Sequence, residues 1–390
     1  MKLLEDIVVV DFCQFLSGPS ASLRLADFGA TVIKVEKPGI GDICREMYVS
    51  DVMIEGDSSI FHAINRNKKS YTADLKSKDD IAKIKALIEK ADVVMNNFRP
   101  GVMERLGLSY EEVKKINPSV IYAGVTGYGE EGEWKNMPGQ DLLLQSLSGL
   151  TWLSNAGDQP PTPMGVAIVD ILAGAHLAQG ILALLYQRCI TGEGGTVQVS
   201  MLESVLDFQF EAITCYYNDG QQLPERSKVS GGHTYLGAPY GIYATADGYI
   251  ALAMGDIVKI GKLVNCEQLQ SYSDVTEWYS NRDEIKMILA QHLQNHTTAH
   301  WLSILEPEGV WCSNVLNYDE LRNEEAYKAL NMEIVVTNSN GVSVITTRSP
   351  FTIDGEITSS NVGAPLLGEH NQEIDKLFGM DEKIKNKIIM

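Results

Sequence analysis

Three sets of residues in the sequence are of types that could do chemistry. The segment 127–132 (GYGEEG) has the GxGxxG spacing of a dinucleotide-binding loop. His292, His296 and His300 have the i, i+4 spacing that could place three imidazoles on one helix face for a metal. Asp170 places a carboxylate at the start of a long apolar segment, where it could cap a helix or act as a nucleophile.

The first two sets fit structural roles better than chemical ones. Glu130 and Glu131 would lie against a pyrophosphate, and the following EWKNMPG does not start a helix, so we interpret segment 127–132 as a glycine-rich loop. The three histidines have no acidic neighbour, and we interpret them as a solvated helix face, with no metal site. The sequence also lacks GxxxxGK[ST], HExxH and GxSxG, which argues against the commonest nucleotide, metalloprotease and serine-hydrolase sites.

The charge and the cysteine content of the sequence limit which binding partners and which compartment it predicts. The chain has 390 residues, with 51 acidic and 32 basic residues and a formal charge of −19, so nucleic acids and membrane surfaces are not predicted as partners. An anionic ligand would need a local cluster of Lys and Arg. Six scattered cysteines without a CxxC pair favour free thiols in a reducing cytoplasm, and the acidic start MKLLEDIVVVDF does not fit a signal peptide.

The first 130 residues alternate short β-branched runs with helical segments. The strand-like runs are DIVVVDF, ATVIKVE, ADVVMNN and PSVIYAGVT, and the helix-like ones include ASLRLADFG and KSKDDIAKIKALIEKA. This alternation predicts a parallel sheet flanked by helices. Ser109 is a candidate N-cap for SYEEVKKINP, with Glu112 at the capping-box position.

The sequence after residue 130 predicts further helices and strands. The apolar stretch 168–186 is interrupted by Asp170, His176 and Gln179, which favours a buried helix over a membrane span. We expect a long helix over 197–218, then a turn-rich linker, and a hairpin at Asp247-Gly248. The tail predicts strands in MEIVVT and GVSVITT followed by a polar helix.

Five stretches, taken in order, resemble the superfamily of class III CoA-transferases and α-methylacyl-CoA racemases. They are DIVVVDFCQFLSGPSASLRLADFGATVIKVEKPGIGD, NRNKKSYTADLKS, NNFRPGVMERLGLSYEEVKKINPSVIYAGVTGYG, the helix near Asp170, and GAPLLGEH. The resemblance spans nearly the whole chain and implies coenzyme A or acyl-CoA as substrate, with no tightly bound cofactor. The basic stretches NRNKK, DLK and NFRPGVMER suit the phosphates of CoA in an otherwise acidic protein.

The resemblance also implies site residues. Asp170 matches the catalytic carboxylate that attacks the thioester in such transferases. The residues that match the CoA-binding surface are Leu16, Ser17, Lys37, Ala73, Asp74, Leu75, Lys76, Asn97, Phe98, Arg99, Arg105, Gln140 and Asp141. Racemases of the superfamily carry a histidine where this chain has Gln140, and because an amide cannot act as a proton-transfer base, Gln140 favours the transferase branch.

At two places, both in the expected acyl pocket, the sequence departs from the pattern of oxalate-using members of this superfamily. Formyl-CoA transferases that use oxalate have a glutamine near Leu16 and a run of glycines before the position of Pro239, whereas this chain has Leu16 and TYLGA at 234–238. Both changes weaken an oxalate assignment, so neither the acyl donor nor the acceptor acid follows from the sequence. Segment 230–233 (SGGH) is a candidate for a mobile gate over the acyl group.

The implied fold is α/β, with a large Rossmann-like domain built from both chain ends and a smaller α+β domain. We place the first part of the large domain at 1–200, a linker helix and loop at 201–227, the small domain at 228–325 and the return to the large domain at 326–390. The resemblance implies an interlocked, obligate homodimer that acts on acyl-CoA and a small carboxylic acid. The alternatives are a racemase-type CoA-ester enzyme and a non-catalytic CoA-binding protein.

Overall fold

The fold was analysed in a computed structural model that describes residues 3–47 and 52–379. The chain divides into two compact units. The first contains the residues up to 144 together with 167–205 and those from 330 onward, and the second contains 145–166 and 206–329.

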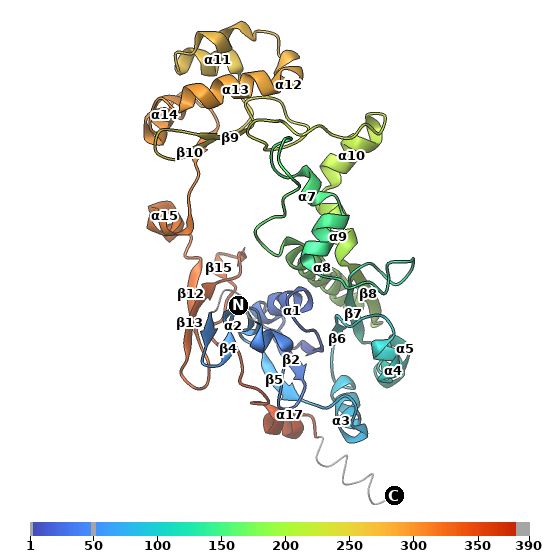
Figure 1. Cartoon of the computed structure of the whole chain (residues 1–390). Helices are drawn as coiled ribbons and strands as arrows, with labels where there is room; N and C mark the ends of the chain where they lie inside the picture. The colour runs from blue at the N-terminus through green and yellow to red at the C-terminus, as the bar shows by residue number, and fades with distance from the viewer. Residues whose placement is uncertain (1–2, 48–51, 380–390) are drawn as a thin grey trace, which may run out of the picture. The chain divides into compact units, whose positions relative to one another are not determined.

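A parallel six-stranded sheet forms the centre of the first unit (Figure 1). The strands are β1 (Val8–Asp11), β2 (Thr31–Glu36), β5 (Lys69–Thr72), β6 (Val93–Asn96), β7 (Ile121–Thr126) and β8 (Gly195–Ser200), in the spatial order β5-β2-β1-β6-β7-β8. All five pairings are parallel. The chain runs outward from β1 in one direction and then from β6 in the other, which is the order of a doubly wound fold. The predicted parallel sheet is confirmed.

Helices cover both faces of this sheet because successive strand residues point to opposite sides. On one face, Val10, Ile33 and Val94 pack with buried residues of α3, α5 and α17. Helices α1 and α8 pack against each other and against strands of the sheet on the other face. The helices of the unit are α1 (Ser17–Asp27), α2 (Ser59–Asn65), α3 (Lys78–Ile88), α4 (Val102–Arg105), α5 (Tyr110–Ile116), α6 (Asp141–Leu147), α8 (Ile168–Thr191), α9 (Met201–Phe208) and α17 (Asn371–Leu377), and η1 (Ile43–Glu46) is a short 3-10 helix.

The C-terminal segment covers edge strand β5, so distant parts of the sequence lie side by side (Figure 1). Asn371 accepts from the backbone N–H of Thr72 at 2.8 Å, and its amide donates to the Thr72 hydroxyl at 2.7 Å. The predicted tail strands are β12 (Glu333–Thr337) and β13 (Ser343–Thr347), which pair antiparallel. Two further antiparallel pairs of short strands belong to this unit: β3 (Met53–Ile54) with β4 (Asp57–Ser58), and β14 (Thr352–Ile353) with β15 (Glu356–Ile357).

The second unit is built on a three-stranded antiparallel sheet. Strands β9 (Gly241–Ala244) and β10 (Tyr249–Leu252) form the hairpin predicted at Asp247-Gly248, and β11 (Cys312–Asn314) pairs with β10. Buried Tyr243, Ile250 and Trp301 belong to its core. Its helices are α7 (Leu150–Leu153), α10 (Phe210–Asn218), α11 (Ile257–Leu263), η2 (Glu267–Ser271), α12 (Glu277–Ser280), α13 (Arg282–Leu293), α14 (Thr298–Leu305), α15 (Tyr318–Asn323) and α16 (Glu325–Ala329).

Two predictions about helices are wrong. The helix expected over 197–218 begins as strand β8, because VQVS pairs along β7, and it is then divided at Gln209 into α9 and α10. The three histidines do not share one helix, because α13 ends at Leu293 and a new helix, α14, starts after Thr297. The Thr297 side chain caps this new helix by accepting from the backbone N–H of His300 at 3.2 Å.

Helix α8 corresponds to the apolar stretch of the sequence. Among the described helices it is the one long and apolar enough to cross a membrane, which is weak support for a span because core helices pass the same test. One face of α8 is buried through Val169, Leu177 and Ile181, so the expected buried helix is buried on that face only. Tyr186 and Ile190, on the same helix, are 72% and 69% exposed in the single chain.

Candidate active site

The predicted site residues gather at one edge of the parallel sheet. Leu16 and Ser17 follow β1, Lys37 follows β2, the residues 73–76 follow β5, and the residues 97–99 follow β6. The carboxyl ends of parallel strands lie at the same edge, and ligands of doubly wound folds bind there, next to the point where the strand order reverses. In this sheet the order reverses between β1 and β6.

Asn97 joins the two loops that flank this reversal point. Its side-chain oxygen accepts from the backbone N–H of Gln14 at 2.9 Å, and its amide nitrogen donates to the Gln14 carbonyl at 2.7 Å. Both polar ends of the Asn97 side chain therefore bind the loop between β1 and α1. This contact was not anticipated from the sequence, which pointed to Asn97 as a CoA contact.

Asp170 lies in the first turn of α8, three residues after the N-cap position. Helix α8 begins at Ile168 and its N-cap is Ala167, which makes no side-chain capping bond. The carboxylate of Asp141, on α6, supplies the missing acceptor: its Oδ2 accepts from the backbone N–H of Val169 at 2.8 Å and of Asp170 at 3.2 Å. The capping role considered for Asp170 therefore belongs to Asp141, and the carboxylate of Asp170 is not used to cap its own helix.

A close approach of two helices brings Asp170 to the start of α1. A Cβ on Gly174, one turn after Asp170, would lie 2.0 Å from the Ser20 hydroxyl and 2.6 Å from the Ser17 carbonyl, so only glycine fits there. The N-cap of α1, Leu16, has no side chain that can accept from the free N–H groups of the first turn. The backbone N–H and the hydroxyl of Ser17 instead donate to the Asp170 carboxylate.

These surroundings set the basicity of the Asp170 carboxylate. Burial raises the pKa of Asp170, and the nearby Asp141 carboxylate raises it further. The two hydrogen bonds from Ser17 lower it, and the result is a pKa of about 6. At neutral pH the carboxylate is thus mostly ionised, yet more basic than an ordinary aspartate, as suits a nucleophile.

Four predicted cations lie on the segments that follow the strands. Lys37, Lys76, Arg99 and Arg105 are exposed, and within the part of the chain that the structure describes none of their side chains makes an ion pair. Cations that are unpaired in a strongly acidic protein are available to bind the phosphates of a ligand. Lys76 comes after β5 in the chain, Lys37 comes after β2, and Arg99 and Arg105 come after β6.

The other predicted contacts have mainly local roles. Ala73 is buried, and its N–H donates to the Glu36 carbonyl at 2.9 Å, which ties the end of β5 to the end of β2. Asp74 Oδ1 accepts from the N–H of Lys76 at 3.0 Å and so shapes the turn, while Leu75 packs at the edge of the sheet core. These contacts hold the turn that carries Lys76.

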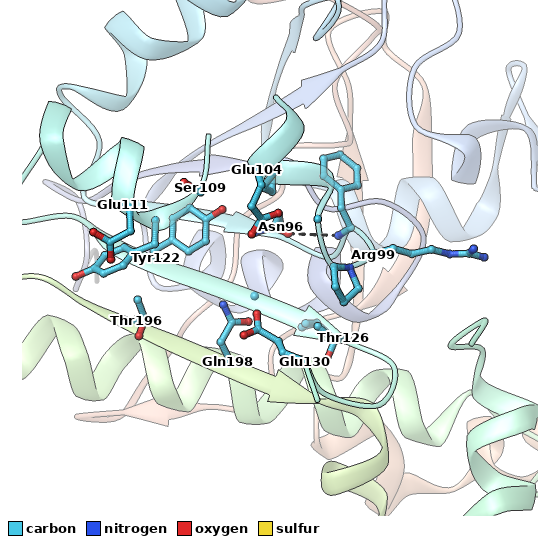
Figure 2. Close-up of a pocket in the computed structure, with 17 residues that line it drawn as sticks. Asn96, Arg99, Glu104, Ser109, Glu111, Tyr122, Thr126, Glu130, Thr196 and Gln198 are labelled. Atoms are coloured by element: carbon cyan, nitrogen blue, oxygen red, sulfur yellow. Dashed lines mark hydrogen bonds between the residues drawn. The ribbon is translucent and has the colours of Figure 1, made fainter. Parts of the chain in front are cut away.

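A pocket of about 420 Å³ extends from this edge over one face of β7 and β8, where Tyr122, Gly124, Thr196 and Gln198 line it (Figure 2). It is lined by two predicted CoA contacts, Phe98 and Arg99, and also by three glutamates, Glu104, Glu111 and Glu130. Burial raises the pKa of Tyr122 in its wall, and the Glu104 and Glu130 carboxylates raise it further. Figure 2 shows the Arg99 side chain extending away from Glu104 and Glu130. This pocket, which the sequence did not indicate, therefore has a negative field and is unsuited to phosphates.

Gln140 and segment 230–233 were the remaining candidates. Gln140 is exposed and directly precedes α6, where its carbonyl accepts from the N–H of Leu143 at 2.9 Å. Segment 230–233 belongs to the second unit and is closely packed there: a Cβ on Gly231 would lie 2.6 Å from the Asn155 carbonyl, and one on Gly232 would lie 2.7 Å from the Tyr240 ring. Its role as a gate stays a prediction.

Comparison with known proteins identifies the family of this chain. The model of CoA-transferase family III matches residues 4–371. An acetyl-CoA:oxalate CoA-transferase of Acetobacter aceti is 33% identical over 97% of this chain and 96% of its own length. A succinyl-CoA:glutarate CoA-transferase of Mus musculus is 30% identical over 100% of this chain and 89% of its own length.

Solved structures have the same fold. A CAIB/BAIF family protein from Brucella suis superimposes with a TM-score of 0.83 at 28% identity, over 95% of this chain and 98% of that protein. Rv3272 from Mycobacterium tuberculosis superimposes with a TM-score of 0.81 at 27% identity. The family model matches almost the whole chain, and the two CoA-transferases are matched over 96% and 89% of their own lengths. The chain belongs to CoA-transferase family III and is an enzyme that transfers CoA between carboxylic acids.

Proposed function

We propose that transfer proceeds through covalent intermediates on Asp170. The observation that carries this proposal is the environment of its carboxylate, which is half-buried, has a pKa of about 6 and accepts from the N–H and hydroxyl of Ser17. A carboxylate suits the reaction because its attack on a thioester yields a mixed anhydride of comparable reactivity. The energy of the thioester bond is therefore conserved.

The first half of the cycle moves CoA onto the enzyme. An Asp170 oxygen attacks the thioester carbonyl of the donor, the C–S bond breaks, and CoA leaves as the thiolate. The thiolate then attacks the Asp170 carbonyl of the anhydride. The donor acid leaves as its carboxylate, and an aspartyl-CoA thioester remains.

The second half repeats these steps with the acceptor acid. Its carboxylate attacks the Asp170 carbonyl and expels CoA thiolate, which forms a new anhydride. The thiolate then attacks the acyl carbon of the acceptor, and the new acyl-CoA leaves with the Asp170 carboxylate restored. Each step exchanges one nucleophile for one leaving group of the same charge, so the cycle needs no net proton transfer.

The residues around Asp170 have distinct roles in this scheme. Ser17 contributes an N–H and a hydroxyl at the start of α1, where the partial positive charge of the helix favours a carboxylate. These donors orient the attacking oxygens and stabilise the carboxylate each time it leaves. Asp141 opposes them, because its negative charge keeps the Asp170 carboxylate basic.

We propose that the four unpaired cations Lys37, Lys76, Arg99 and Arg105 bind the nucleotide end of CoA. For the acids, the relatives act on oxalate, glutarate and mesaconate, which supports a dicarboxylic acid as one substrate. Leu16 and segment 234–238 depart from the oxalate pattern, so we favour a dicarboxylate longer than oxalate.

We further propose that the protein is cytoplasmic and forms an interlocked homodimer. Light scattering on the purified protein should then give twice the mass of one chain.

A panel of acyl-CoAs and free acids tests the function. Purified enzyme is incubated with acetyl-, succinyl- or glutaryl-CoA and with oxalate, succinate, glutarate, mesaconate or a monocarboxylate, and the CoA esters are separated. We expect net transfer to a dicarboxylate longer than oxalate. In deuterated water the enzyme should leave the α-carbon of a 2-methylacyl-CoA unlabelled, because Gln140 cannot return a proton. Rapid α-exchange without CoA transfer would refute the proposal.

A further inference from the structure

The loop between β1 and α1 is held by side chains from other parts of the first unit. The Cys13 carbonyl accepts from the Lys34 ammonium at 2.9 Å, and the Phe15 N–H donates to Asp42 Oδ1 at 3.2 Å. Between them, Gln14 is bound at both its N–H and its carbonyl by Asn97. Four successive backbone polar groups of residues 13–15 thus bind three side chains from three different segments.

Two of these side chains form a buried ion pair. Lys34 Nζ lies 2.6 Å from Asp42 Oδ2, and the two side chains are 0% and 1% exposed. Asp42 Oδ1 also accepts from the Cys44 N–H at 2.9 Å, and this fixes the carboxylate. The other charged groups that act on Lys34 are Asp11 and Glu36, with Lys68 opposing them from across Asp11.

The loop requires such support because of its backbone. Phe15 has a φ of +62°, in the left-handed region that non-glycine residues seldom occupy, and its side chain is exposed. A conformation of this kind persists only where the surrounding structure determines it. Two residues later, Ser17 begins α1 and donates to Asp170. Any relaxation of Phe15 would move these donors away from the carboxylate.

We propose that Lys34, Asp42 and Asn97 are positioning residues for the nucleophile: together they clamp residues 13–15 and thereby aim the Ser17 donors at Asp170. This inference rests on the proposed covalent role of Asp170. It concerns how fast Asp170 is acylated rather than how tightly CoA binds. A misplacement of about 1 Å can cost roughly 100-fold in rate, so the clamp has a measurable effect.

The first test replaces both members of the ion pair, which avoids leaving one charge buried alone. In Lys34→Met/Asp42→Asn, single-turnover formation of the aspartyl adduct should slow by about 10- to 100-fold, with KM for acyl-CoA changed less than about threefold. The low-pH limb of the kcat/KM profile should move to higher pH, because weaker hydrogen bonds from Ser17 raise the pKa of Asp170. Within the described chain, the charged group that acts on Asp170 is the Asp141 carboxylate, which both substitutions leave in place.

A matched control is a second buried ion pair of the same unit. Arg66 and Asp27 bond through two oxygens, are each 1% exposed, and lie at the far end of α1 from Ser17. Asp27→Asn/Arg66→Met should lower the unfolding temperature without moving the low-pH limb. If the low-pH limb of the kcat/KM profile shifted equally in both double variants, the Lys34–Asp42 pair would have only a general stabilising role. That result would overturn the proposal.

Asn97→Ala gives an independent test in a partly exposed position, should the double variant fail to fold. A positioning role predicts a lower adduct-formation rate and a shifted low-pH limb with little change in KM. A role in CoA binding predicts the reverse, a raised KM with an unchanged limb, and would overturn the proposal for Asn97. If wild-type enzyme forms no adduct at all, the covalent mechanism fails instead, so the two failures are distinguishable.

Discussion

The two halves of one sheet edge differ in charge. The segments after β5, β2, β1 and β6 carry four unpaired cations and the Ser17 donors that face Asp170. The pocket toward β7 and β8 is lined by three glutamates, and its one arginine points away from Glu104 and Glu130. The pocket is a formed cavity, yet its three carboxylates would repel a CoA phosphate. We therefore base the proposed CoA site on local charge rather than on the presence of a cavity.

This difference matters more because the protein carries a formal charge of −19. A polyanionic substrate is repelled by most of its surface, so it can approach only where several cations lie close together. The same contrast operates at short range on Asp170, where the Asp141 carboxylate and the Ser17 donors act in opposite directions.

Removing the Asp170 carboxylate should have the largest effect. Asp170→Asn keeps the shape of the side chain but removes the nucleophile, so transfer should fall by roughly 10⁴-fold or more. The measurement is the rate of CoA-ester exchange at saturating substrates. Residual activity within tenfold of wild type would show that Asp170 is not the attacking group.

The same variant carries its own folding control. Because the folded protein raises the pKa of Asp170, its ionised form destabilises the fold above the ordinary aspartate pKa. Asp170→Asn should therefore unfold at a higher temperature than wild type at pH 7 to 8, and the difference should vanish near pH 4. A lower unfolding temperature at pH 7.5 would mean that lost activity reflects damage to the fold.

Neutralising the cationic half should impair binding. Lys76→Ala, Arg99→Ala or Arg105→Ala should each raise KM for acyl-CoA about tenfold, the cost of one charge-assisted contact, with a smaller change in kcat. The effect should shrink as salt is added, because the contacts are exposed. Steady-state kinetics at two ionic strengths measure this. An unchanged KM in all three variants would assign these residues to the solvated surface.

A smaller effect is expected for Asp141. Asp141→Asn retains an oxygen that can accept from the N–H groups of Val169 and Asp170, but it removes the like charge that raises the pKa of Asp170. The low-pH limb of kcat/KM, which we expect near pH 6 in the wild type because the pKa of Asp170 is about 6, should then move to lower pH. Asp141→Ala, which also loses the cap, serves for comparison. A limb that stays in place would mean that burial alone sets the basicity of Asp170.

Substitutions in the glutamate-lined pocket should have the smallest effect on catalysis. Glu104→Gln, Glu111→Gln and Glu130→Gln remove charges of the pocket without touching the cations, so KM for acyl-CoA should change by less than about twofold. Any change should be toward tighter binding, since each substitution weakens a repulsive field. A KM raised tenfold by one of them would place CoA in the pocket and reverse the comparison.

Sequence patterns predicted the local features of this fold well. The strands DIVVVDF and ATVIKVE became β1 and β2, and Ser109 caps α5 by accepting from the Glu112 N–H. The patterns failed where contacts with residues distant in the sequence determine the local structure. VQVS is a strand because β7 lies beside it, and Asp141 rather than Asp170 receives the N–H groups of α8 because α6 approaches that helix.

The candidate site was found by resemblance, whereas its supporting contacts required the structure. No spacing in the sequence indicates that Lys34 reaches Cys13 or that Asn97 reaches Gln14, since these pairs are joined only by the order of the strands. The glutamate-lined pocket was likewise invisible, because Glu104, Glu111 and Glu130 lie on separate segments. Side chains that converge through topology leave no periodic signal.

Trapping the covalent intermediate tests the central claim most directly. Wild-type enzyme is mixed with an acyl-CoA in the absence of an acceptor acid, quenched in acid, digested and examined by mass spectrometry. We predict a CoA adduct on the peptide that contains Asp170, released by hydroxylamine and absent from Asp170→Asn. An adduct on another residue, or wild-type transfer by Asp170→Asn, would contradict the account.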